Sequence, residues 1–236
     1  MPTKATSKTT GQRTGSPTVG SASAVVMVLS VATGATDAIS FTRLGNVFAS
    51  VMTGNMVLLG VSAGRREATL AAHAGVSFAA YIAGSALGAR LCGHQRSMPQ
   101  WRTRARAALG VELALFVGVT IGWELSAAHP RGALQLGLLP MAVLAMAVQA
   151  SLARSMPEQT PSTTYMTGTL TAAGSALMTG SPLRAQQRRI GAVLGLIAGA
   201  GLAAILVEEA PRTAPLLVLA VLIVAFAAAS THPTRP

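Results

Sequence analysis

Four polar residues and a glycine that could form a binding site lie close together near the start of the sequence: Asp37, Asn46, Thr53, Gly54 and Asn55. Asp37 follows an apolar run, and a carboxylate inside a membrane helix is costly unless it faces a polar or wet cavity. The alternative is an Asp37 at the membrane interface that caps the next turn. A short helix that begins near Gly54 inside the membrane would direct free N–H groups and the positive end of its dipole at an anionic group.

The Thr-Gly pattern occurs twice in the chain. Residues 51–56 read Val-Met-Thr-Gly-Asn-Met, and residues 165–170 read Tyr-Met-Thr-Gly-Thr-Leu. We expect the second segment to form the wall opposite the first, with Thr164, Thr167, Gly168 and Thr169. The alternative is that Thr and Gly in both segments only allow tight helix packing.

Two further polar residues, Glu112 and Gln149, lie inside long apolar stretches. Acidic side chains within membrane helices mark ion or proton pathways, so Asp37 and Glu112 are the candidate coupling residues. The alternative for Glu112 is that its side chain extends toward a nearby arginine cluster. Gln149 can both donate and accept hydrogen bonds in a cavity.

Motifs for enzyme chemistry are missing from the sequence. Residues 60–64 read Gly-Val-Ser-Ala-Gly, which matches the hydrolase nucleophile pattern by letter, but the strand–turn–helix setting of that pattern is lacking. The chain has a single cysteine, Cys92, and neither a His-Glu-x-x-His motif nor a Walker loop. We therefore expect a protein that is not an enzyme, with no catalytic residues, no metal site and no cofactor.

Composition identifies the elements that must position these residues. Of the 236 residues, 51% are apolar and only 11% are charged, whereas soluble domains carry about 25% charged residues. The mean hydropathy is +0.52. These values exclude a soluble or disordered chain and predict a polytopic, all-α membrane protein whose main partner is the lipid bilayer. The net charge is +11, and the basic residues lie mainly between the apolar blocks. This placement is typical of charges that set membrane topology, so we expect no nucleic-acid binding.

Apolar blocks divide the chain into long and short segments. A straight span needs about 20 residues, with a range of about 17–25. Residues 1–22 are a polar stretch expected to be a disordered cytoplasmic leader, and 23–232 form one membrane domain. The long blocks are 24–41, 68–92, 107–126, 134–153, 190–207 and 216–229, and the short blocks are 47–63 and 164–179.

The order of these blocks repeats, which predicts repeat one at about 24–127 and repeat two at about 133–230. The helix after each short block carries small residues at every fourth position, a pattern that lets membrane helices approach closely. These two small-residue ladders either pack within one chain or form a homodimer. Their residues are Ala80, Gly84 and Gly88 in the first half and Gly191, Gly195 and Gly199 in the second.

Counting lysine and arginine discriminates between two topologies. If both short blocks span the membrane, the eight spans leave ten positive residues on one side and eight on the other. If both short blocks are broken or re-entrant, six spans leave thirteen inside and five outside, which fits the positive-inside rule better. Three spans in each half predict two inverted repeats, an architecture typical of transporters. Both termini are then cytoplasmic.

The sequence resembles the YoaK-like family at residues 34–48, at residues 52–55, at Gln149 and at residues 163–170. The members are bacterial integral membrane proteins, and they form a domain-of-unknown-function family. The resemblance covers about residues 24–230. One departure is Gln149-Ala150-Ser151, where the family pattern has Gln-Asn-Ala, which weakens a polar role there. The resemblance implies a multi-pass inner-membrane protein and no established substrate.

These observations favour a small secondary transporter or channel for an unknown small solute, with a central polar site at the two Met-Thr-Gly segments. A membrane-embedded enzyme and a non-catalytic membrane scaffold are the alternatives. Convergence of Asp37, Asn55, Thr167 and Gln149 on one cavity would favour transport, and dispersal onto separate loops would favour a scaffold.

Overall fold

The computed structural model describes residues 19–93, 98–155 and 183–230, together with Gly168, Thr171, Gly174, Ser175 and Met178. This part of the chain forms seven α-helices and a short 3-10 helix, and it contains no strand. The helices are α1 (Val19–Arg43), α2 (Met52–Arg65), α3 (Ala68–Cys92), α4 (Met98–Leu125), α5 (Gly132–Arg154), α7 (Leu183–Glu209), η1 (Pro211–Thr213) and α8 (Ala214–Ser230).

Apolar side chains face outward as well as inward, as expected for helices in lipid. Leu125, Ile197, Ile205 and Ile223 are all more than half exposed, which a soluble protein would avoid over so large a surface. Five helical stretches within the described residues are long and apolar enough to cross a membrane: Ala68–Cys92, Thr103–Leu125, Gly132–Arg154, Ile190–Glu209 and Pro211–Ser230. The described part of the chain is therefore all-helical, and its apolar helices fit an integral membrane protein.

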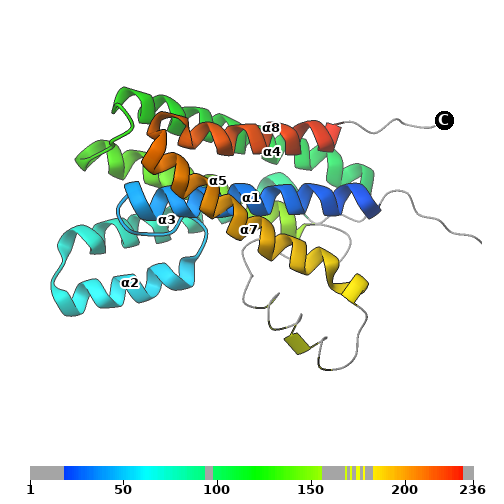
Figure 1. The fold of residues 1–236 in the computed structure, drawn as a ribbon, viewed down its shortest axis with the longest axis horizontal. Helices are drawn as coiled ribbons and strands as arrows, with labels where there is room; N and C mark the ends of the chain where they lie inside the picture. The colour runs from blue at the N-terminus through cyan, green and yellow to red at the C-terminus, as the bar shows by residue number, and fades with distance from the viewer. Residues whose placement is uncertain are drawn as a thin grey trace, which may run out of the picture.

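The long helices run side by side, and α5 is the most enclosed of the five candidate spans (Figure 1). The 25 residues of α1 make it about 37 Å long, and it lies between the others in the bundle. Helix α1 packs mainly on α7 and α8, α3 packs on α5, and α4 packs on both α5 and α8. The first residue of α1 and the last residue of α8 lie at the same end of the bundle.

Both small-residue ladders lie at the closest helix contacts. A Cβ added at Gly84 of α3 would come within 2.7 Å of Ala147 Cβ and 2.8 Å of Leu144 O of α5. A Cβ at Gly199 of α7 would overlap the backbone carbonyl of Val31 in α1. The ladders therefore pack within one chain. A homodimer stays a prediction, and it would have to use other helix faces.

Helix α2 is short and lies at the edge of the bundle against α3 (Figure 1). Its 14 residues give a length of about 21 Å, which is less than the roughly 30 Å hydrocarbon core. In Figure 1 its Arg65 end lies at the same side of the molecule as the Arg43 end of α1. The segment 44–65 thus turns back along α1 and returns to the end from which it started.

Most helix positions predicted from the apolar blocks agree with the structure, and α3 matches the predicted block 68–92. The first short block differs, because residues 44–51 are irregular and the helix begins only at Met52. A reversal occurs at Gly45 (φ 104°) and Asn46 (φ 59°), where the backbone takes positive φ values that Gly and Asn tolerate best. Helix α1 begins at Val19, inside the stretch predicted as leader, and most of block 164–179 lies outside the described residues.

We expect Gly84→Leu and Gly199→Leu to reduce the yield and the thermal midpoint of folded protein. A large side chain at these positions forces apart helices in backbone contact, and overpacking costs about 1–3 kcal/mol or more. Matched controls on the same helices are Gly75→Leu in α3 and Gly201→Leu in α7, where an added Cβ meets nothing within 4 Å. The measurement is size-exclusion yield and thermal melting in detergent, and equal behaviour of all four variants would contradict the packing account.

Candidate functional site

The turn between α1 and α2 is held by the carboxylate of Asp37. The backbone N–H of Ser50 donates to Asp37 Oδ1 at 2.7 Å, and the Ser50 hydroxyl donates to Oδ2 at 2.5 Å. Asp37 lies six residues before the end of α1, so the connection reaches back about 9 Å along that helix. Buried backbone N–H and C=O groups outside regular secondary structure need other hydrogen-bond partners, and the Asp37 carboxylate is the partner of the Ser50 N–H.

A second clamp in the same turn is formed by Asn55. Its side-chain amide accepts a hydrogen bond from Phe48 N at 2.9 Å and donates one to Phe48 O at 2.6 Å, and the residue is only 1% exposed. The Phe48 ring stacks on Phe41 with ring centroids 5.1 Å apart. It also lies over Gly54, where an added Cβ would be 3.2 Å from the ring. Residues 48–50 are thus fixed from both neighbouring helices.

Gln149 links the two central helices. Its Nε2 donates to Thr33 Oγ1 at 2.7 Å and to Leu29 O at 3.2 Å, which joins α5 to α1. Its Oε1 is buried and has no hydrogen-bond partner among the described residues. The carbonyl oxygen of the Gln149 side chain therefore accepts no hydrogen bond from the described residues at the contact between α1 and α5.

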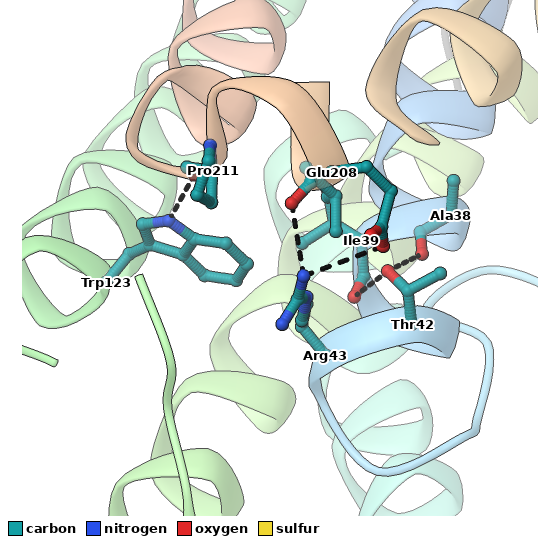
Figure 2. Close-up of polar contacts among 8 residues, drawn as sticks. Ala38, Ile39, Thr42, Arg43, Trp123, Glu208 and Pro211 are labelled. Atoms are coloured by element: carbon teal, nitrogen blue, oxygen red, sulfur yellow. Dashed lines mark hydrogen bonds and ion pairs between the residues drawn. The ribbon is translucent and has the colours of Figure 1, made fainter. Parts of the chain in front are cut away.

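Arg43 secures the end of α1 where the turn begins (Figure 2). Its guanidinium donates to Val207 O at 3.1 Å and lies 3.6 Å from Glu208 Oε1, so it pairs with the end of α7 rather than with Asp37. Its carbonyl oxygen accepts a hydrogen bond from Gln135 Nε2 at 2.8 Å. Trp123 Nε1 donates to Pro211 O at 2.8 Å nearby, which joins α4 to the linker between α7 and α8 (Figure 2).

A cavity of about 520 Å³ opens at the same end, between the α1–α2 turn and the beginnings of α3 and α5. His73 lines it although the residue is only 3% exposed. The Nδ1 atom of His73 lies 2.7 Å from Thr69 O, and its Nε2 atom is buried without a partner among the described residues. Other polar residues that line the cavity are Asn46, Arg65, Glu67, Thr69 and Gln135.

Of the predicted site residues within the described chain, Asn46 alone lines this cavity. Asp37, Asn55 and Gln149 are buried, but each has its own partner and none of them lines the cavity. Asn46 does line it, and its side chain is exposed. Thr53 is exposed and Gly54 is half-buried.

The second segment is described at only a few positions. Gly168 is helical and exposed, with nothing within 4 Å of an added Cβ. Thr164, Thr167 and Thr169 lie outside the described residues. The opposite wall and a shared site with Thr53 therefore stay predictions.

Glu112 lies in α4 with 0% of its surface exposed. Neither carboxylate oxygen has a hydrogen-bond partner within the described chain. Arg90, Arg104 and Arg106 therefore do not bind the Glu112 carboxylate, whereas Arg96 lies outside the described residues, so the alternative of a side chain extended to the arginine cluster stays a prediction. No group of three or more His, Cys, Asp or Glu side chains that could hold a metal ion occurs among the described residues.

Four residues that shape the turn and the cavity were not singled out in the sequence: Phe48, Ser50, His73 and Gln135. Ser50 has only its closeness to the Thr-Gly motif as a signal. His73 is the sixth residue of α3. A histidine and a glutamine inside apolar blocks are the signals that could have found His73 and Gln135.

A helical bundle with five apolar stretches long enough to cross a membrane, and with apolar side chains on its outer surface, fits a polytopic membrane protein. The model of the family described as "Protein of unknown function (DUF1275)" matches residues 25–229, and the chain belongs to this family. The predicted membership in a domain-of-unknown-function family is confirmed. No curated protein and no solved structure matches the chain.

We expect Asn55→Ala to loosen the turn between α1 and α2. The substitution leaves the half-buried N–H and C=O of Phe48 without their partner, at a cost of up to about 1–3 kcal/mol for each group. Hydrogen–deuterium exchange of the amides in residues 44–52 should rise by about tenfold or more relative to wild type. Asn46→Gly is the control, because Asn46 is exposed and Gly accepts its positive φ. Unchanged exchange in Asn55→Ala would contradict the role of this clamp.

Proposed function

We propose that this protein is a small secondary transporter or channel for a small solute, as the sequence predicts. The observation that carries the proposal is the turn of residues 44–51, which leads from α1 back into the bundle before α2 returns to the same end. Secondary transporters place such broken helices beside their substrate sites. The cavity at His73 and Asn46 would be the entrance, and the Asp37–Ser50 contact would lie beneath it.

The pairing of helices supports an arrangement as two inverted repeats. We count α1 as the sixth span and match α1 with α5, α3 with α7 and α4 with α8. If these pairs are equivalent helices of two repeats, each contact of a helix must have a counterpart made by its equivalent. The counterpart of α1–α7 is α5–α3, the counterpart of α1–α8 is α5–α4, and all four contacts are present. The α4–α8 and α1–α5 contacts are also present, and each joins a helix to its own equivalent in the other repeat. A pseudo-two-fold axis in the membrane plane produces this kind of pattern.

Charge supports the proposed orientation, with both termini in the cytoplasm of a bacterial cell. The end of the bundle with the cavity carries Arg43, Arg65, Arg66, Arg131 and Arg212, together with Glu67, Glu124, Glu208 and Glu209. The opposite end, where α1 begins and α8 ends, carries Arg90, Arg104, Arg106, Arg154, Arg184, Arg188 and Arg189. This second end has no acidic residue in the described chain, so the positive-inside rule assigns it to the cytoplasm.

We expect Arg66→Cys, in a Cys92→Ala background, to react with a membrane-impermeant maleimide in intact cells. Arg66 follows α2 at the cavity end and is exposed. Arg154→Cys is the matched partner, since Arg154 is an exposed arginine at the opposite end, and it should react only after permeabilisation. The reverse pattern of labelling would contradict the orientation. Labelling of both variants in intact cells would contradict the placement of Arg66 and Arg154 on opposite sides of the membrane.

Transport itself is tested in proteoliposomes on a solid-supported membrane, with a panel of amino acids, small carboxylates, inorganic anions and sugars. We expect at least one class to produce a current absent from empty liposomes. Asp37→Asn should lower it by about tenfold or more, because a hydrogen bond to a charged group contributes about 1.5–3 kcal/mol. The control is Glu124→Gln, an exposed acidic residue at the end of α4.

Two outcomes would contradict this proposal. A wild-type protein that moves no member of the panel would argue against transport. Equal currents in Asp37→Asn and wild type would remove Asp37 from the proposed mechanism.

A further inference from the structure

We propose that Glu112 is a proton-binding site inside the bundle and that its proton is exchanged during the transport cycle. The exchange rests on the proposed transport function, whereas proton binding by Glu112 can be tested separately.

Glu112 lies deep in a membrane-spanning helix. In the span Thr103–Leu125 it is nine residues, or about 13 Å, beyond Thr103. It is fully buried, and both carboxylate oxygens lack a hydrogen-bond donor within the described residues. An isolated carboxylate in such surroundings is very costly as an anion, because it loses its hydration and gains no compensating partner.

The helices packed against α4 offer no cation to Glu112. They are α5, α8 and, over a smaller contact, α3. Helix α8 contains no ionisable residue, and the only one in α5 is Arg154 in its last position, where it is exposed. Helix α3 contributes His73, Tyr81, Arg90 and Cys92, and no hydrogen bond or ion pair joins any of these residues to Glu112.

The charged residues of α4 itself lie near its ends. Arg104 and Arg106 are exposed, about 2.2 and 1.7 turns before Glu112, and Arg104 donates to Leu91 O. Arg102 lies ten residues before Glu112 in the sequence of α4. Glu124 is exposed at the other end of the helix. A metal ion would need further oxygen or nitrogen ligands, and no cluster of three candidate ligands exists in the described chain. A proton is the one cation that a single carboxyl group can hold without other ligands.

Asp37, the other acidic residue buried in the described bundle, is in a different situation. Both of its oxygens receive hydrogen bonds from Ser50, which compensate an anionic carboxylate. The sequence analysis named both buried acids as candidate coupling residues, but their surroundings differ. Asp37 stabilises the turn, and Glu112 binds the proton. Because Glu112 is enclosed between α4 and its neighbours, proton exchange requires α4 to move relative to α5 and α8. Relative motion of two repeats is the step that gives alternating access in inverted-repeat transporters.

Proton binding is tested by infrared spectroscopy of the full-length protein in lipid nanodiscs, as a titration from acidic to alkaline buffer. We expect a carboxylic C=O stretching band of the protonated form that decreases as the buffer becomes alkaline, and that is absent from Glu112→Gln. Glu124→Gln is the control and should keep the band. A titration of Glu112→Gln identical to that of wild type would overturn the proposal.

Should Glu112→Gln fail to fold, the wild-type protein still decides the question. A hydrophobic carbodiimide adds to protonated carboxyl groups in apolar surroundings, and peptide mass spectrometry locates the adduct. We expect labelling at Glu112 that declines in alkaline buffer. Absence of labelling at Glu112 in acidic buffer, where Glu112 would be protonated, would overturn the proposal.

Coupling is tested in proteoliposomes that contain a pH-sensitive dye, with the solute identified in the panel described above. We expect solute-driven proton movement in wild type and movement no larger than that of empty liposomes in Glu112→Gln. Proton movement equal to that of wild type in Glu112→Gln would remove the coupling role. Absence of transport in wild type with a titrating Glu112 band would instead contradict the transport function and leave proton binding standing.

Discussion

The interruption of the helix between α1 and α2 imposes the strongest constraint on this structure. In the proposed arrangement residues 44–51 lie in the membrane interior, which offers no water to unpaired N–H and C=O groups. These residues can then be irregular only if other groups in the protein pair with their N–H and C=O groups. Asp37 accepts from Ser50, and Asn55 both accepts from and donates to Phe48. These contacts fix the path of the turn, and that path determines where α2 begins.

Close helix packing provides the frame for this turn. Without a hydrophobic driving force between helices in lipid, association depends on van der Waals contact and hydrogen bonds. Gly84 and Gly199 bring α3 against α5 and α7 against α1, and Gln149 adds hydrogen bonds between α1 and α5. Arg43 fastens the end of α1 to the ends of α7 and α5. The turn is therefore supported on a helix that is itself held by three neighbours, α5, α7 and α8.

Much of this architecture could be predicted from the sequence, because the membrane imposes simple length and hydropathy rules. Apolar blocks located the long helices to within a few residues at most ends, and the spacing of Gly84 and Gly88 indicated a close helix contact. The site was harder to predict, since hydrogen-bond partners depend on tertiary placement. Asp37 was recognised as unusual, but nothing in the sequence distinguishes Ser50 from other serines as its partner. The sequence around Glu112 is compatible with a buried side chain and with one extended to the arginines. The outcome depends on whether the face of α4 that carries Glu112 points into the bundle, which the sequence does not specify.

The central claim is that residues 44–65 enter and leave the membrane at one side, and electron paramagnetic resonance depth measurements test it most directly. Spin labels are attached through Val51→Cys and Gly64→Cys in a Cys92→Ala background, at two exposed positions of α2 and its start. The account predicts that the label at position 51 collides with oxygen in the hydrocarbon core, whereas the label at position 64 collides with a water-soluble nickel complex at the interface. If both labels collide with the nickel complex at opposite membrane surfaces, α2 crosses the membrane and the account is contradicted.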